Sequence, residues 1–195
     1  LGVLAPNGND PSSYWDALTN GRSGIASITR FDASGQKVRI AGEVSGFDPE
    51  TVFDRKEARR TDPFVQYAVG AATQAFDRAG LDIARLDPTR FGVIFGSGIG
   101  GISTLETQHT VLASKGPGRI SPFFVPMIIS DMSAGMISIK LGAQGPNFTT
   151  VSACASGANA IGEAARKIQY GEADVMITGG SEAGVTPLSV AGFAA

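Results

Sequence analysis

The segment Phe91–Phe95 reads Phe-Gly-Val-Ile-Phe and lies between Arg90 and Gly96. An uninterrupted apolar run of this length is typical of a strand buried on both faces of a parallel sheet. Two more runs of strand length, at 148–153 and 175–178, follow it and are separated by segments with helical spacing. Strands that alternate with helices predict an α/β fold, with helices layered on a mainly parallel sheet.

Start and stop signals place five helices around these strands. Asp10 and Asp62 are each followed by proline, and this pair is typical of a helix N-terminus, whereas Gly21 and Gly80 are typical of helix ends. The expected helices cover residues 10–20, 62–79, 103–114, 126–141 and 156–170, and a further short strand covers 38–44. The second of these helices has apolar residues on more than one face, so we expect it to be largely buried. The proline-rich segment 115–126 is expected to be a loop.

Composition excludes several classes of protein. The chain has 195 residues, of which 43% are hydrophobic and 17% charged, so it can bury one core and is too apolar to be disordered. With 16 basic and 18 acidic residues it has no overall positive field, and we expect no nucleic-acid partner. No apolar run reaches the length of a membrane span. Since the chain has no initial methionine and no polar C-terminal tail, we expect a piece of a larger protein.

The numbers of cysteines and histidines exclude an intrachain disulfide and a typical zinc site. One cysteine cannot form an intrachain disulfide, which favours a reducing, cytoplasmic location. One cysteine and one histidine cannot build a zinc site of the usual kind, and we expect no metal.

Cys154 lies at an expected strand-to-helix junction in which every neighbour is small. Small residues permit a sharp turn that presents one side chain at the carboxyl end of a strand, as in nucleophile elbows. The N-terminus of the following helix would offer unpaired N–H groups and partial positive charge, which favour a thiolate and could hold an oxyanion. A lone cysteine is also often a small buried hydrophobe. Position alone leaves both interpretations open.

Two other motifs each allow two interpretations. Gly96–Gly101 fits the dinucleotide fingerprint G-x-G-x-x-G, although residues 115–121 offer neither the strand nor the acidic residue that should follow. The charged turn Arg55–Arg60 contains four basic residues and one acid. It could steer an acidic partner, or it could be an ordinary solvated helix face.

Several motifs together resemble the β-ketoacyl synthase family, the condensing enzymes of fatty-acid synthesis. The segment Ser152–Gly157 is similar to the active-site segment of that family. The other segments that match in family order are Leu1–Gly8, Gly96–Gly101, Ser121–Pro126 and Ala173–Gly180. The resemblance implies a thiolase-like fold, in which two similar halves stack as α/β/α/β/α. Residues 1–195 would form the first half, truncated at both ends.

The resemblance also implies roles for individual residues. Cys154 would be the nucleophile and, through its backbone N–H, an oxyanion donor. The acyl pocket would be lined by Ile99, Ile102 and Phe193, and by Phe124 from the partner subunit of a homodimer. Acyl carrier protein would dock on Lys56, Arg59 and Arg60. Substrates would arrive on the phosphopantetheine of that carrier, so neither a metal nor a nicotinamide cofactor is expected.

The implied reaction is the decarboxylative condensation of malonyl-acyl-carrier-protein with a cysteine-bound acyl chain. The family uses two histidines from its second half, whereas the only histidine here, His109, falls in an expected helix and matches no family role. We therefore expect the isolated chain to be inactive. A polyketide ketosynthase and a thiolase acting on coenzyme A thioesters are alternatives, as are two non-enzymes, a dinucleotide-binding module and an inactive partner subunit.

Overall fold

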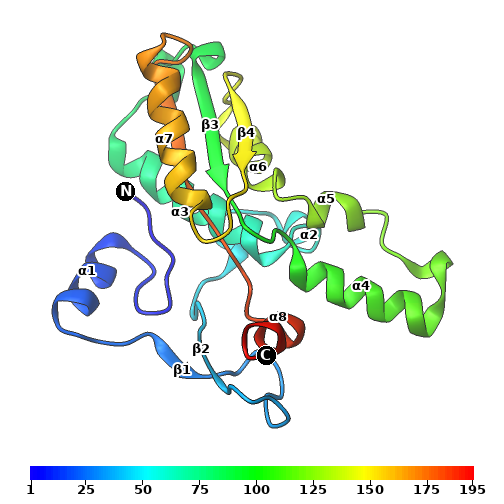
Figure 1. Cartoon of the computed structure of the whole chain (residues 1–195). Coiled ribbons are helices and arrows are strands. Elements are labelled where there is room, and N and C mark those ends of the chain that lie inside the picture. Colours follow the sequence, from blue (N-terminus) through cyan, green and yellow to red (C-terminus); the bar gives the residue numbers. More distant parts are fainter.

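A three-stranded parallel sheet forms the centre of the computed structural model, which describes residues 1–195 (Figure 1). The strand order is β4 (Asn147–Thr150), β3 (Phe91–Gly96) and β5 (Val175–Gly180). All six residues of the middle strand are buried. The apolar run therefore does form the central strand of a parallel sheet, as predicted.

Helices cover both faces of this sheet, and a small antiparallel hairpin lies to one side (Figure 1). The helices are α1 (Pro11–Thr19), α2 (Arg55–Ala58), α3 (Pro63–Ala79), α4 (Ile102–Lys115), α5 (Phe124–Ile128), α6 (Met132–Leu141), α7 (Ser156–Gln169) and α8 (Pro187–Phe193). The hairpin consists of β1 (Ile25–Ser27) and β2 (Ile40–Gly42).

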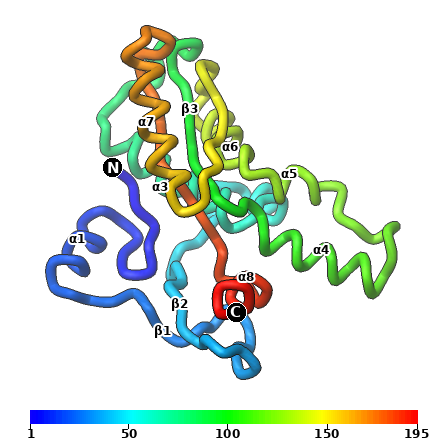
Figure 2. Tube along the Cα trace, in the orientation of Figure 1, coloured from blue at the N-terminus to red at the C-terminus, as the bar shows by residue number.

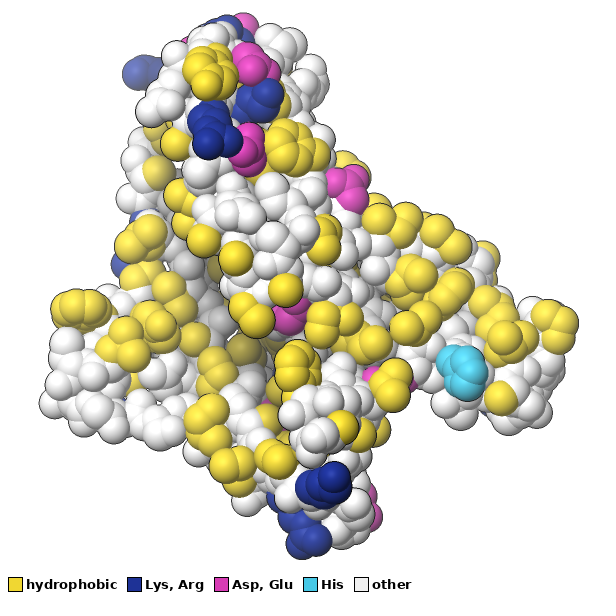
Figure 3. Space-filling model, in the orientation of Figure 1, with side chains coloured by type: hydrophobic (Ala, Val, Ile, Leu, Met, Phe, Trp, Pro, Cys, Tyr) yellow, Lys and Arg dark blue, Asp and Glu magenta, His cyan; other side chains and the backbone are white.

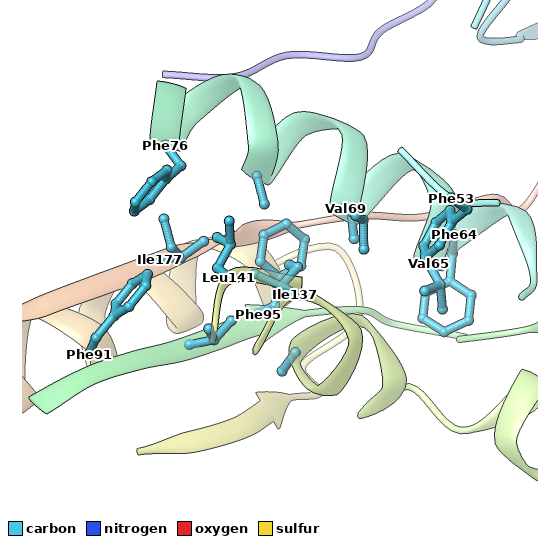
Figure 4. Packing of buried hydrophobic residues seen from close by; sticks show 14 residues of the cluster. Phe53, Phe64, Val65, Val69, Phe76, Phe91, Phe95, Ile137, Leu141 and Ile177 are labelled. Carbon is cyan, nitrogen blue, oxygen red and sulfur yellow. The ribbon is translucent and has the colours of Figure 1, made fainter. Parts of the chain in front are cut away.

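Side chains of β3 alternate between the two helical layers. Phe91, Val93 and Phe95 belong to the larger core, which α3 and α6 complete (Figure 4). Ile94 points the other way and packs on Ala160 of α7. Because both layers bury apolar side chains against one strand, the sheet is the middle layer of an α/β/α arrangement.

Most helix ends fall where the sequence places them. Asp10 and Asp62 cap the N-termini of α1 and α3 through their carboxylates, and proline occupies the first helical position of each. Gly80 ends α3 in the left-handed region, with φ of 65°. Helix ends of this kind can be predicted from the sequence. Each depends on a hydrogen bond or a backbone angle that residues next to it in the chain determine.

The prediction of one helix over 126–141 is wrong. The structure has two helices there, α5 and α6, and α5 begins inside the segment 115–126 that was expected to be loop. The break has a tertiary cause: the carbonyl of Ile128 accepts a hydrogen bond from the backbone N–H of Gly101, at 3.2 Å. That bond takes the place of the next intrahelical bond, and Ile129 adopts an extended conformation.

Asp62 has a second function besides capping, since it connects α3 to α4. Its carboxylate is 0% exposed and accepts hydrogen bonds from the backbone N–H of Thr104, at 2.9 Å, and from the Thr104 hydroxyl, at 2.7 Å. Burial raises the pKa of Asp62 above its ordinary value of 3.8, and the two bonds from Thr104 oppose that shift. The two bonds from Thr104, together with a bond from the Phe64 N–H at 3.3 Å, therefore favour the charged form of this buried carboxyl.

Replacing Thr104 by valine tests this effect. Thr104→Val keeps the size of the side chain but removes one donor to a buried charge, so the free energy of unfolding at neutral pH should fall by about 1–3 kcal/mol. The lost bond favours the charged carboxyl, and its removal raises the pKa of Asp62 further. The loss should therefore shrink as the pH is lowered toward 3.8, where the native carboxyl is protonated. Urea denaturation at several pH values measures both effects.

Thr107→Val is the matched control. Thr107 is an exposed threonine of the same helix, and its hydroxyl bonds only to the carbonyl of Ser103. Its replacement should change the free energy of unfolding by no more than about 0.5 kcal/mol. Equal losses for the two variants, or a loss at Thr104 that ignores pH, would contradict the importance of the Asp62 contact.

Candidate active site

The carboxyl ends of the three parallel strands meet at one edge of the sheet. Gly96 at the end of β3 is paired in register with Thr150 of β4 and with Gly180 of β5. The chain leaves each strand into a loop at this edge, and these loops come together (Figure 2). In open α/β sheets this edge is where ligands bind.

Glycines let the first turn of α7 rest directly on the strand ends. A Cβ on Gly96 would lie 2.3 Å from the carbonyl carbon of Ser156. A Cβ on Gly180 would lie 2.8 Å from the Cα of Gly157. Neither distance is possible for real atoms, so both strand ends must lack a side chain for α7 to begin here.

The turn that enters α7 is sharp and held from within. Ala153 has φ of 50° and is the only residue other than glycine with a positive φ. The Ser156 hydroxyl donates to the Ala153 carbonyl at 2.7 Å and accepts from the Ser152 N–H at 2.9 Å. The expected strand 148–153 thus ends early, at Thr150, because residues 151–153 form this turn instead of pairing.

Cys154 follows the strained residue and is exposed. It lines a cavity of about 800 Å³ at the carboxyl edge of the sheet. The backbone N–H groups of Cys154 and Gly157 donate to no acceptor in the chain, so they remain available to a ligand. The structure contradicts the buried small hydrophobe and shows the geometry of a nucleophile elbow.

The cavity brings together some of the residues expected to line an acyl pocket. Ile99, from the glycine loop Gly96–Gly101, and Phe193, from α8, both line it together with Cys154. Ile102, the first residue of α4, is buried and does not line this cavity. Phe124 also lies outside the lining of this chain, so its predicted approach from a partner subunit stays a prediction.

Glu182 is a residue of this cavity that sequence reasoning missed. One oxygen of its carboxylate accepts hydrogen bonds from the backbone N–H of Gly98, at 2.7 Å, and of Ile99, at 3.1 Å. The other oxygen accepts from the Ser97 hydroxyl at 3.3 Å. An acidic residue two positions after a strand of this sheet was the available signal, because strand ends share the edge with the glycine loop.

These contacts bear on the dinucleotide interpretation of Gly96–Gly101. A pyrophosphate would need the loop N–H groups and the N-terminus of the following helix. The carboxylate of Glu182 already occupies the N–H groups of Gly98 and Ile99, and Asp62 accepts from Thr104 in the first turn of α4. The chain's own anions therefore fill the positions that a phosphate would take.

The basic residues expected to dock a partner lie on a separate surface. Lys56 is on α2, Arg59 and Arg60 follow it directly, and all three are exposed and outside the lining of the cavity. A capping box formed by Asp54 and Glu57 starts this short helix. Arg60 differs from the other two, since its guanidinium lies over the ring of Phe123, 4.2 Å from the ring centre.

His109 is exposed on α4 and does not line the cavity. No three side chains of His, Cys, Asp or Glu lie close enough together to hold a metal ion. None of the helices combines the length and the apolar character needed to cross a bilayer.

The sequence matches the family described as "Beta-ketoacyl synthase, N-terminal domain" over residues 1–195. Among curated proteins it is 53% identical, over all of this chain, to 3-oxoacyl-(acyl-carrier-protein) synthase 2 of Synechocystis sp. and 52% identical to the protein of the same name from Staphylococcus aureus. It covers 47% and 48% of those two proteins. The chain thus spans about half the length of these curated relatives.

Solved structures of ketosynthases superpose on this chain over almost its whole length. The ishigamide ketosynthase/chain length factor superposes with a TM-score of 0.89 at 30% identity, over 98% of this chain and 48% of that one. A β-ketoacyl synthase from Burkholderia phymatum gives 0.84 at 27% identity, over 97% and 47%. A type II polyketide ketosynthase, solved with its acyl-carrier protein and bound to a hexaketide, gives 0.84 at 26%, over 98% and 51%. These neighbours have the thiolase-like fold, and the present chain shares it.

The glycine packing beneath Cys154 can be tested with two Gly→Ala variants. Gly96→Ala places a methyl group against the backbone of α7, so we expect the free energy of unfolding to fall by about 1–3 kcal/mol. Gly162→Ala lies within α7 where a Cβ meets nothing, and it should leave stability unchanged or raise it by up to about 1 kcal/mol. Urea denaturation measures both. A Gly96→Ala variant as stable as the original would mean that α7 does not need this close approach.

Proposed function

Since the chain belongs to the β-ketoacyl synthase family, in which it matches the N-terminal domain, we propose that it carries the acyl-accepting cysteine of an enzyme that lengthens acyl chains. One observation supports this most: Cys154 is exposed at a strained strand-to-helix turn and opens into a cavity of about 800 Å³. The 52–53% identity to two 3-oxoacyl-(acyl-carrier-protein) synthases favours fatty-acid elongation as the pathway.

The first step is the transfer of an acyl group to Cys154. The thiolate sulfur attacks the carbonyl carbon of an acyl thioester on the phosphopantetheine of acyl carrier protein. A new carbon–sulfur bond forms to Cys154, the bond to the phosphopantetheine sulfur breaks, and that sulfur leaves as a thiolate. The free N–H of Cys154 can donate to the carbonyl oxygen while it carries negative charge.

The second step is carbon–carbon bond formation. Malonyl carrier protein loses carbon dioxide, and the resulting carbanion attacks the carbonyl carbon of the acyl thioester on Cys154. A carbon–carbon bond forms, the carbon–sulfur bond to Cys154 breaks, and that sulfur leaves as a thiolate, so the 3-oxoacyl chain, two carbons longer, remains on the carrier protein. Decarboxylation and cleavage of the thioester supply the free energy for the condensation. We therefore propose neither a metal nor a nicotinamide cofactor. His109 is exposed on α4 outside the cavity, so groups that promote decarboxylation must come from the rest of the enzyme.

The proposed partner is acyl carrier protein, docked on Lys56, Arg59 and Arg60. The three exposed basic residues form a local positive patch in a chain whose net charge is −2. Such a patch attracts an acidic protein and speeds the encounter. A structural neighbour was solved as a ketosynthase in complex with its acyl-carrier protein, which supports this kind of partner. A carrier site favours a synthase over a thiolase that uses coenzyme A thioesters.

We also propose a homodimer. Large apolar side chains are exposed along the arm formed by α4 and α5 (Figure 3), and one more is exposed on α6. Val125 and Ile129 are exposed, and Ile139 is 74% exposed. Apolar area of this kind is typical of an obligate interface, and a partner subunit seated there could bring Phe124 to the pocket of its neighbour. The polyketide ketosynthases among the structural neighbours are less similar, at 26–30% identity, and stand as the second candidate.

Loss of the sulfur should stop the reaction. In the full-length enzyme, Cys154→Ala should reduce elongation by more than ~1,000-fold, because the covalent intermediate can no longer form. Mass spectrometry after incubation with acyl carrier protein should show an acyl adduct on Cys154 in the original protein and none in the variant. Cys154→Ser keeps the shape and serves as the folding control. Elongation at the normal rate in the alanine variant would overturn the proposed function.

Charge reversal tests the docking site. Lys56→Glu with Arg59→Glu should raise the KM for acyl carrier protein by ~10-fold at low salt. The effect should fade above 0.1 M salt, where the Debye length is ~10 Å. Arg60 is left in place because it also stacks on Phe123. Lys37→Glu with Arg39→Glu, two exposed residues before and beside β2, changes the net charge equally and should have little effect. Equal KM values for the two double variants would reject the patch.

A further inference from the structure

The middle of the glycine loop is held by one side chain. Ser97 at its start is anchored to β4, through its N–H and the Thr150 carbonyl, and Gly101 at its end is anchored to Ile128 of α5. Between these anchors, the N–H groups of Gly98 and Ile99 donate only to the Glu182 carboxylate, at 2.7 and 3.1 Å. The conformation of the loop at Ile99 therefore depends on Glu182.

The Glu182 carboxylate lies close against the glycine loop. A Cβ on Gly98 would lie 2.9 Å from the carboxylate oxygen of Glu182. The Ser97 hydroxyl, which is buried, donates to the second carboxylate oxygen and accepts from the N–H of Gly100 at 3.1 Å. One carboxylate thus ties three successive residues of the loop, directly or through Ser97, to the end of β5.

Ile99 is the side chain that this arrangement places. It is 42% exposed, it lines the cavity that Cys154 also lines, and its outermost methyl group lies 3.9 Å from where a Cβ on Gly184 would be. Ile99 is therefore part of the cavity wall. The glycines that follow it, Gly100 and Gly101, pack closely on the backbone of α5 and the residues after it, whereas the N–H groups of Gly98 and of Ile99 itself bond only to Glu182. The position of Ile99 in the wall depends on the hydrogen bonds that its N–H and the N–H of Gly98 donate to the Glu182 carboxylate.

We propose that Glu182 is a positioning residue that sets selectivity for acyl chain length by holding Ile99 in the cavity wall. The inference rests on the proposed function, since it assumes that the cavity receives the acyl chain bound to Cys154. A fixed wall discriminates between chains of different length, because one methylene in an apolar pocket changes specificity by ~10-fold or more. A loop released from Glu182 lets Ile99 move and accommodates chains that differ in length.

Two substitutions of Glu182 distinguish the effect of side-chain length from the effect of charge. Glu182→Gln keeps the length of the side chain and a carbonyl oxygen that can accept both N–H bonds, but it removes the charge. Glu182→Asp keeps the charge and is one methylene shorter, so it cannot span the same distance. If Glu182 acts by holding Ile99 in place, the glutamine variant retains selectivity for acyl chain length and the aspartate variant loses it. Glu172→Gln, at an exposed ion pair with Lys167, is the control and should leave selectivity unchanged.

The measurement uses the full-length enzyme and acyl carrier proteins loaded with hexanoyl, decanoyl or myristoyl groups. Acyl transfer to Cys154 is followed by mass spectrometry, and kcat/KM is determined for each donor. In Glu182→Asp, the ratio between the best and the worst donor should fall by at least ~10-fold. Ile99→Ala should lower the ratio as well, and adding Glu182→Asp to it should change the ratio little further, because both act through one side chain.

The outcomes distinguish the two proposals. If Cys154 of the original enzyme is never acylated, the proposed function fails. If it is acylated but Glu182→Asp keeps the original donor ratio, or if the effects of Glu182→Asp and Ile99→Ala simply add, only the inference about Glu182 fails. Thermal unfolding of each variant shows whether it is folded, and the glutamine variant provides the conservative rescue where the aspartate variant is unstable.

Discussion

The structure depends on how closely α7 approaches the ends of two strands. Gly96, Gly157 and Gly180 lie at this contact, and a Cβ on Gly96 or Gly180 would collide with the helix backbone. Because the helix begins on top of the sheet, the chain must turn sharply after Thr150, and the strain falls on Ala153. The exposed sulfur of Cys154 is the result of that geometry. Packing between backbones, with no side chain in between, is thus the origin of the site.

Two carboxylates, the buried one of Asp62 and the exposed one of Glu182, organise the rest of the edge. Asp62 joins α3 to the first turn of α4, and Glu182 joins the end of β5 to the loop before α4. Each occupies N–H groups that could otherwise attract an anion, so the glycine loop works here as a wall and not as a phosphate cradle. The same sequence pattern therefore has a different use when the chain supplies its own negative charge.

The sequence predicts the central layer well because the signals there are local. The apolar run of β3, the caps of α1 and α3, and the small residues around Cys154 each carry their own information. The break between α5 and α6 could not be predicted, since it comes from a bond between Ile128 and Gly101, which lie far apart in the sequence. Glu182 was missed for the same reason: its partners are more than 80 residues away. Of the residues that the family resemblance implies for an acyl pocket, Ile99 and Phe193 line the cavity of this chain and Ile102 does not, and their role in binding an acyl chain stays a prediction.

The contact between α7 and the strand ends also limits how the chain can vary in length. An α-helix turns by about 100° for each residue, so one residue inserted between Ser156 and Gly157, at the start of α7, would turn Gly157 away from Gly180. It would also carry the sulfur off the edge of the sheet. The spacing around the sulfur is therefore fixed by backbone geometry.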